Sequence, residues 1–124
     1  IDPSVGISRL FTGGTRMKFC DLKEIKGISP LSDGGNPFRA WKRVYCCDLL
    51  SHALAHAPAG CAFITVIANE NTLAVALRRE VSCVVFAEGV VVPETLLSCA
   101  KQHGIALAAS TLPAFETGLL LQEN

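Results

Sequence analysis

The sequence predicts an α/β fold of three layers, in which a mostly parallel sheet is covered by helices on both faces. Three short runs of unbroken apolar residues lead to this prediction: 61–68 (CAFITVIA), 83–87 (CVVFA) and 105–109 (IALAA). Each run is followed by a segment whose apolar residues recur at helical spacing. Fully apolar strands that alternate with helices are typical of parallel sheets buried on both faces.

Length and composition fit one domain with a packed core, because half of the 124 residues are hydrophobic and 18% are charged. Lys+Arg and Asp+Glu balance at 11 each, so the chain lacks the basic excess typical of nucleic-acid binding. No apolar run reaches the roughly 18 residues of a membrane span. The six cysteines fall mostly in apolar runs, as free buried thiols do. Without a secretory signal pattern, we expect a cytoplasmic protein with no membrane or nucleic-acid partner.

The first sixteen residues differ from the rest. Residues 1–16 are loop-like, with three glycines and no clear period, whereas a helix-like run begins directly after Met17, the single methionine of the chain. We therefore expect residues 1–16 to be a vector-derived or disordered tail. Residues 17–124 are then one domain.

The elements before residue 60 are predicted from spacing and caps. Phe19, Leu22 and Ile25 predict a short helix, and strands are expected near residues 28–31 and 43–47. Asp48 is expected to cap the next helix, because its carboxylate can accept hydrogen bonds from the free amides of a first turn. The apolar stripe of that helix is Leu49, Leu50, Ala53, Leu54 and Ala57.

Three further helices are predicted after the apolar strands. Asn69 is expected to cap a helix over residues 69–79. A second helix over 93–103 has Pro93 at its first position and Gly104 just past its end. A closing helix is expected over residues 113–121.

Ligands of such sheets bind at the carboxyl ends of the strands, so we expect a ligand site among the polar residues there. The candidates are Asp48, Asn69, Asn71, Thr72, Glu88, Gly89 and Thr111. For each of them, capping of a helix alone is the more ordinary alternative. Arg39, beside Trp41, is a further candidate for an anionic ligand, with packing of this basic-aromatic cluster on the body as the alternative.

Two constellations have the residue types of a metal or redox centre. Asp48, His52 and His56 lie four residues apart and would share one face of a helix, as metal ligands do. The alternative is a solvated helix face, and no HExxH motif is present. Cys46 and Cys47 form a vicinal pair, either a redox or metal element or ordinary filling of a strand.

Motifs of self-sufficient catalysis are missing. The sequence has no GxxxxGK[ST] phosphate loop, no GxGxxG fingerprint and no GxSxG nucleophile motif. Cys99 and His103 share a helix face, but without the electropositive setting that activates a thiol. We therefore expect no enzymatic activity and no resident cofactor.

The order of several segments resembles a known family. Residues 83–121 hold an apolar strand, a glycine turn, Pro-Glu opening a helix, Gly-Ile before the next strand and a Phe-Glu pair in the last helix. Residues 45–51 (YCCDLLS) are similar to the YVSDLLS segment of stand-alone DRTGG proteins, and residues 63–65 and 71–76 continue the match. The chain thus resembles the DRTGG domain and the related N-terminal domain of HPr kinase/phosphorylase over about four-fifths of its length.

The chain departs from this family at the motif that names it. That motif should fall just before Tyr45, where the chain has residues 38–44 (FRAWKRV). Only Arg39 matches, so the ligand contacts of the motif are not carried over.

The resemblance implies a three-layer α/β fold, like the N-terminal domains of HPr kinase and of some Mur ligases. It also implies an accessory or regulatory role. From the open α/β pattern with polar strand ends and no catalytic set, we expect a domain that senses a ligand or binds a protein partner, with a homodimer as the assembly. A nucleotide, a phosphorylated metabolite or another small anion is the expected ligand. The alternatives are an accessory subunit of a redox system, such as the iron-hydrogenase-associated relatives, or of a kinase system, and a metal-binding protein that uses Asp48, His52 and His56.

Overall fold

The computed structural model describes residues 17–122, so the expectation about residues 1–16 lies outside the described residues. A five-stranded sheet has the order β1-β5-β4-β3-β2. Its strands are β1 (Ile28–Ser32), β2 (Val44–Cys46), β3 (Ala62–Thr65), β4 (Cys83–Phe86) and β5 (Leu107–Ser110). Strands β2 to β5 are parallel, and β1 pairs with β5 in the antiparallel sense. The predicted α/β class with a mostly parallel sheet is confirmed.

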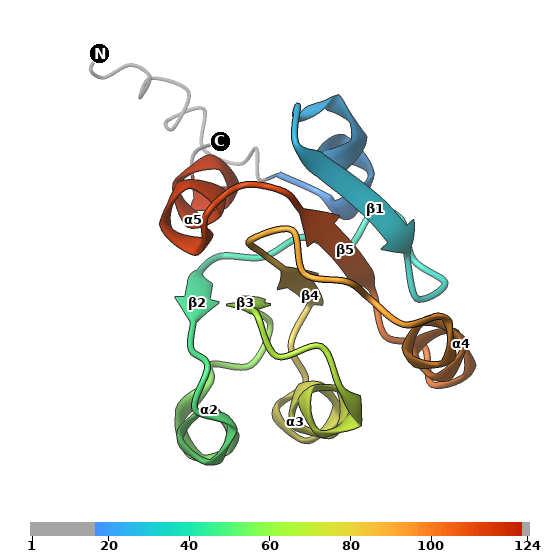
Figure 1. The fold of residues 1–124 in the computed structure, drawn as a ribbon, viewed down its shortest axis with the longest axis vertical. Helices are drawn as coiled ribbons and strands as arrows, with labels where there is room; N and C mark the ends of the chain where they lie inside the picture. Colours follow the sequence, from blue (N-terminus) through green and yellow to red (C-terminus); the bar gives the residue numbers. More distant parts are fainter. Residues whose placement is uncertain (1–16, 123–124) are drawn as a thin grey trace.

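Helices cover both faces of this sheet (Figure 1). The helical elements are the 3-10 helix η1 (Phe19–Glu24) and the α-helices α2 (Leu50–His56), α3 (Glu70–Arg79), α4 (Glu94–Gln102) and α5 (Ala114–Gln122). Helices α2, α3 and α4 lie on one face, and η1 and α5 lie on the other. Because side chains alternate along a strand, Phe63 packs with the first group and Ile64 with the second.

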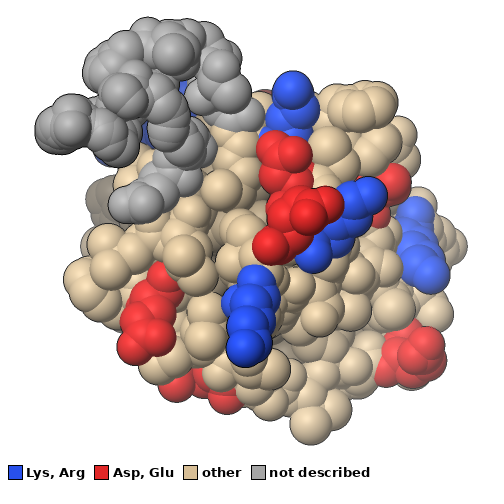
Figure 2. All heavy atoms as spheres, turned by 90° about the horizontal axis from the view of Figure 1, so that it is seen from above, with Lys and Arg blue, Asp and Glu red and all other residues tan. Residues whose placement is uncertain are grey.

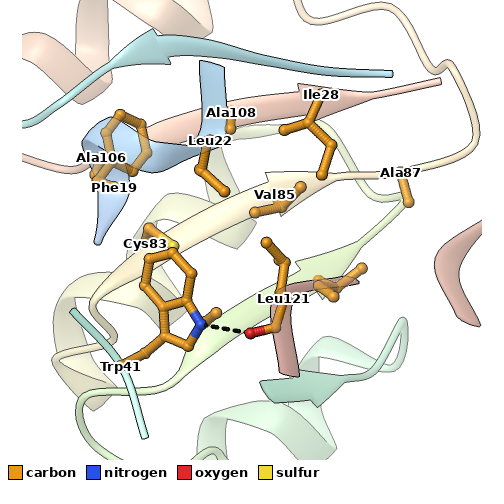
Figure 3. Close-up of a cluster of buried hydrophobic side chains, with 12 residues drawn as sticks. Phe19, Leu22, Ile28, Trp41, Cys83, Val85, Ala87, Ala106, Ala108 and Leu121 are labelled. Carbon is orange, nitrogen blue, oxygen red and sulfur yellow. Dashed lines mark hydrogen bonds between the residues drawn. The ribbon is translucent and has the colours of Figure 1, made fainter. Parts of the chain in front are cut away.

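Trp41 connects the loop before β2 to the last helix. Its side chain is 4% exposed and lies in the core between the sheet and α5. The indole Nε1 donates a hydrogen bond of 3.1 Å to the backbone oxygen of Leu121 (Figure 3). A buried indole N–H needs a partner of this kind. The predicted packing of Trp41 on the body is therefore observed.

The elements follow the predicted order with shifted ends. Strand β3 ends at Thr65 rather than at residue 68, because the Thr65 hydroxyl accepts from the amide of Ile67 and the chain turns there. Pro93 precedes α4 as its N-cap instead of being its first residue. On α2, the predicted apolar stripe is too wide, since Leu49 and Leu54 are exposed while Ala53 and Ala57 are buried.

The described surface carries both signs of charge. On the face shown in Figure 2, acidic and basic side chains are interspersed, and neither sign forms a continuous cover. Between residues 17 and 122, no helix is both long and apolar enough to cross a membrane.

Candidate functional site

The polar residues that follow the strands lie along one edge of the sheet. Strands β2, β3, β4 and β5 are parallel, so their carboxyl ends share this edge. The predicted candidates Asp48, Asn69, Glu88 and Thr111 each follow one of these strands. Their contacts divide them into residues that hold loops together and residues that line a cleft.

Asp48 connects two strand ends and does not cap α2. Its Oδ1 atom accepts a hydrogen bond of 2.7 Å from the hydroxyl of Thr65 and one of 2.9 Å from the amide of Val66. The N-cap of α2 is Leu49, which makes no side-chain cap. The prediction that Asp48 caps this helix is therefore wrong, because its carboxylate instead accepts a hydrogen bond from the buried Thr65 hydroxyl.

Glu88 and Gly89 join the loop after β4 to the end of β5 and the start of α5, whereas Thr111 joins the loop after β5 to the residue before β1. The Glu88 Oε2 atom accepts a hydrogen bond of 2.8 Å from the amide of Ala114, at the start of α5. The Gly89 amide donates to the Ser110 oxygen over 2.9 Å, and the Thr111 amide donates to the Gly27 oxygen over 2.9 Å. Glu88 thus caps a helix, which is the ordinary alternative weighed for these candidates.

Asn69 and Thr72 shape the start of α3. The Asn69 Oδ1 atom accepts a hydrogen bond of 2.9 Å from the Asn71 amide, so Asn69 caps the helix as predicted. Thr72 is fully buried, and its hydroxyl donates to the backbone oxygen of Ile67. Burial therefore removes Thr72 from the set of residues that a ligand can reach.

An open cleft of about 420 Å³ lies where α3 and α4 begin. It is lined by Ala68, Asn69, Glu70, Asn71, Pro93, Thr95 and Leu96. Sequence reasoning found Asn69 and Asn71 but missed the α4 side. The available signal was the adjacency of two apolar strands, which places the helices that follow them next to each other at one edge.

The chemistry of this cleft is polar with one negative charge. The side chains of Asn71, Thr95 and Glu70 are exposed there and make no hydrogen bond or ion pair with another described residue. Among the described residues that line the cleft, none is Lys or Arg. Amide, hydroxyl and carboxylate groups beside the exposed, apolar Pro93 can hold a ligand that has hydrogen-bond donors and an apolar surface.

Arg39 lies away from this edge. Its guanidinium donates to three backbone oxygens: Nε to Asn36 over 3.2 Å, Nη1 to Ser82 over 2.9 Å and Nη2 to Gly34 over 3.2 Å. Ser82 directly precedes β4, so Arg39 lies at the amino ends of the parallel strands. The structure does not bring Arg39 together with the other candidates, because its guanidinium joins the 34–39 loop to the residue before β4.

The predicted metal and redox constellations do not form closed sites. The rings of His52 and His56 lie 4.3 Å apart on α2, but the Asp48 oxygen Oδ1 bonds Thr65 and Val66. No cluster of three or more His, Cys, Asp or Glu side chains able to hold a metal ion occurs within residues 17–122.

The thiol of Cys46, one half of the vicinal pair, has little thiolate character. Burial is the main cause that raises the pKa of Cys46, and the nearby Asp48 and Cys47 raise it further. The Cys99 sulfur lies 3.7 Å from the Nδ1 atom of His103, which is also 2.9 Å from the Cys99 backbone oxygen. A raised pKa disfavours the thiolate that redox and nucleophilic chemistry require.

Comparison with known proteins identifies a structural neighbour. No family model matches the chain, and no curated protein matches it. The fold is similar to the crystal structure of the CBS and DRTGG domains of the regulatory region of Clostridium perfringens pyrophosphatase, complexed with its activator diadenosine tetraphosphate. The TM-score is 0.66 at 11% sequence identity. The match covers 97% of this chain but 56% of the other, so the chain spans little more than half of that structure. The likeness supports a DRTGG-like fold.

Proposed function

We propose that this chain is a regulatory domain that binds an adenine nucleotide at the cleft between α3 and α4. The observation that carries the proposal is the cleft itself, which lies at the carboxyl edge of a parallel sheet and presents the side chains of Asn71, Thr95 and Glu70. Ligands of open α/β sheets bind at this edge. The fold is like that of a regulatory region crystallised with a nucleotide activator, and this supports the choice of ligand class.

The size and lining of the cleft suit a nucleoside. Its volume of about 420 Å³ falls in the range of small-molecule sites, which is about 300–1,000 Å³. Pro93 and Ala68 offer apolar surface to a base, while Asn71 and Thr95 offer hydrogen bonds to its edge. A ligand in this place would touch the start of two helices.

Calorimetric titration with adenosine, ATP and diadenosine tetraphosphate tests the proposal. We expect saturable binding that Thr95→Trp abolishes, because the indole would fill the cleft from an exposed position on α4. Gln102→Trp places the same side chain at an exposed position at the other end of α4 and should leave binding unchanged. Absence of binding by all three ligands, or equal loss in both variants, would contradict the proposal.

Self-association through α5 is a second candidate function. Phe115 and Leu119 lie one turn apart on this helix and are 74% and 49% exposed. Glu116 is the single ionisable side chain of α5, so two copies can meet there with little charge repulsion. A homodimer of this kind would suit a regulatory domain, since it doubles the ligand sites in one assembly.

A further inference from the structure

The cleft is suited to the nucleoside part of a nucleotide and poorly suited to its phosphates. Glu70 is the first residue of α3, and Glu94 is the first residue of α4. A carboxylate in the first turn offsets the positive end of the helix dipole, which would otherwise attract an anion. With Glu70 in the cleft wall and no described cation beside it, a phosphate group there would meet net repulsion.

A second cavity adjoins the cleft and has the opposite charge. A groove of about 220 Å³ runs between α2 and α3, lined by Leu50, Ser51, Leu54, Asn71, Ala74, Val75 and Arg78. Asn71 lines both the groove and the cleft. The two cavities therefore flank Asn71 in the first turn of α3, and an extended ligand would have to cross this residue to occupy both.

Arg78 is the cation of the groove. It is exposed and makes no hydrogen bond or ion pair with another described residue. Its neighbour Arg79 is different, because the Arg79 Nε atom donates to the Ala57 oxygen over 2.9 Å. A guanidinium that makes no hydrogen bond or ion pair with the described residues can bind phosphate oxygens with two parallel hydrogen bonds, and the Ser51 hydroxyl lines the same groove.

The spacing fits the length of a nucleotide. Asn71 and Arg78 are seven residues apart on α3, so their Cα atoms are separated by roughly 10 Å along the axis. Long side chains on a helix point back toward its N-terminus, which shortens the gap between the Arg78 guanidinium and Asn71. A triphosphate chain attached to a ribose can bridge this distance.

We propose that the nucleotide lies across the first turn of α3, with its nucleoside in the α3–α4 cleft and its phosphates in the α2–α3 groove at Arg78. This inference rests on the proposed function and adds the division of the ligand between two cavities. Asn71 then contacts the ligand at the junction between nucleoside and phosphates. A nucleoside that carries phosphates should bind more tightly than adenosine, because only the phosphates contact Arg78.

Titrations of adenosine and ATP into the unaltered protein, Arg78→Gln and Arg78→Lys test the division. We expect Arg78→Gln to weaken ATP binding about ten-fold or more while adenosine binding stays unchanged. Arg78→Lys should restore part of the ATP affinity, because the charge remains but the bidentate fork is lost. Lys101→Gln, on the exposed surface of α4, removes one positive charge elsewhere and should change neither affinity.

The outcomes separate the two proposals. Equal binding of ATP by Arg78→Gln and the unaltered protein, with both ligands bound, would overturn the division and leave the proposed function standing. Equal weakening of ATP and adenosine would also overturn it, because Arg78 would then not be specific to the phosphates. Failure of both ligands to bind the unaltered protein would overturn the proposed function and this inference together.

Discussion

Thr65 donates a hydrogen bond of 2.7 Å from its hydroxyl to the carboxylate of Asp48, which joins the end of β3 to the segment after β2. The amide of Val66 donates to the same oxygen over 2.9 Å. Thr65 is 1% exposed, so its hydroxyl has little access to water. The sheet edge that carries the cleft is thus held in shape by a carboxylate that sequence reasoning assigned to a helix cap.

The Asp48 bond makes a testable contribution to stability. Asp48→Ala leaves the buried Thr65 hydroxyl and the Val66 amide without this acceptor, so the free energy of unfolding should fall by about 1–3 kcal/mol. Asp48→Asn keeps an acceptor oxygen and should cost less. Urea denaturation of the three proteins measures the difference. Equal stability of Asp48→Ala and the unaltered protein would contradict this role.

Arg39 is expected to matter for stability and not for ligand binding. Its three hydrogen bonds connect Asn36, Gly34 and Ser82, far from the cleft. Arg39→Ala should therefore lower the free energy of unfolding by about 1.5–3 kcal/mol, the range for hydrogen bonds to charged groups. Nucleotide affinity, measured by calorimetry at a temperature where the variant is folded, should stay unchanged. A selective loss of affinity with full stability would instead place Arg39 at the ligand.

Two buried thiols predict an alkaline loss of stability. Burial raises the pKa of Cys83 from 9.0 to about 12, and burial likewise raises the pKa of Cys61 to about 11. Below pH 9 both thiols are protonated in the folded and the unfolded chain, so the full stability is present. Above pH 9 the unfolded chain ionises first, and the free energy of unfolding falls by about 1.4 kcal/mol per group and pH unit until the folded pKa is reached.

Urea denaturation between pH 8 and about pH 11 measures this loss. The double variant Cys61→Ala, Cys83→Ala removes both thiols and should show a clearly shallower decline, although it begins from a lower stability because two buried sulfurs are gone. The comparison of slopes excludes the contribution of lysines and Tyr45, which both proteins share. Parallel slopes would show that neither thiol ionises on unfolding in this range.

The central part of the fold was predictable because local pattern and tertiary position agree there. Strands β3, β4 and β5 are apolar on both faces, and this is visible in sequence without knowledge of the neighbours. The strand near residue 28 was found, but not its pairing, because Ile28 meets Ser110 through contacts between distant parts of the chain. Pro30 fits its position on an edge strand.

The candidate site was predictable to a smaller extent. Asn69 and Asn71 follow a strand and could be named from sequence, whereas Thr95 belongs to the cleft only because α4 lies beside α3. The three partners of the Arg39 guanidinium include Ser82, which is 43 residues away. A short-range pattern indicates which residues end a strand. It does not indicate which of their polar side chains are already hydrogen-bonded to distant parts of the chain.

The exposed face of α5 predicts a concentration-dependent dimer. Burial of Phe115 and Leu119 against a second copy would remove apolar surface from water, which is the main driving force of association. Sedimentation velocity over a range of protein concentrations should show dimer formation, and Phe115→Ser with Leu119→Ser should give a monomer. Because these side chains are exposed in the single chain, the free energy of unfolding of the monomer should change by only about 0.5 kcal/mol.

Phe38 provides the matched control for this prediction. It is 68% exposed and aromatic like Phe115, but it lies in the loop before Arg39 rather than on α5. Phe38→Ser should therefore leave the dimer unchanged, since general surface hydrophobicity falls while the α5 face stays intact. If the unaltered protein sediments as a monomer at every concentration, or if Phe38→Ser dissociates the dimer as fully as the α5 variant does, then α5 is not the interface between two copies.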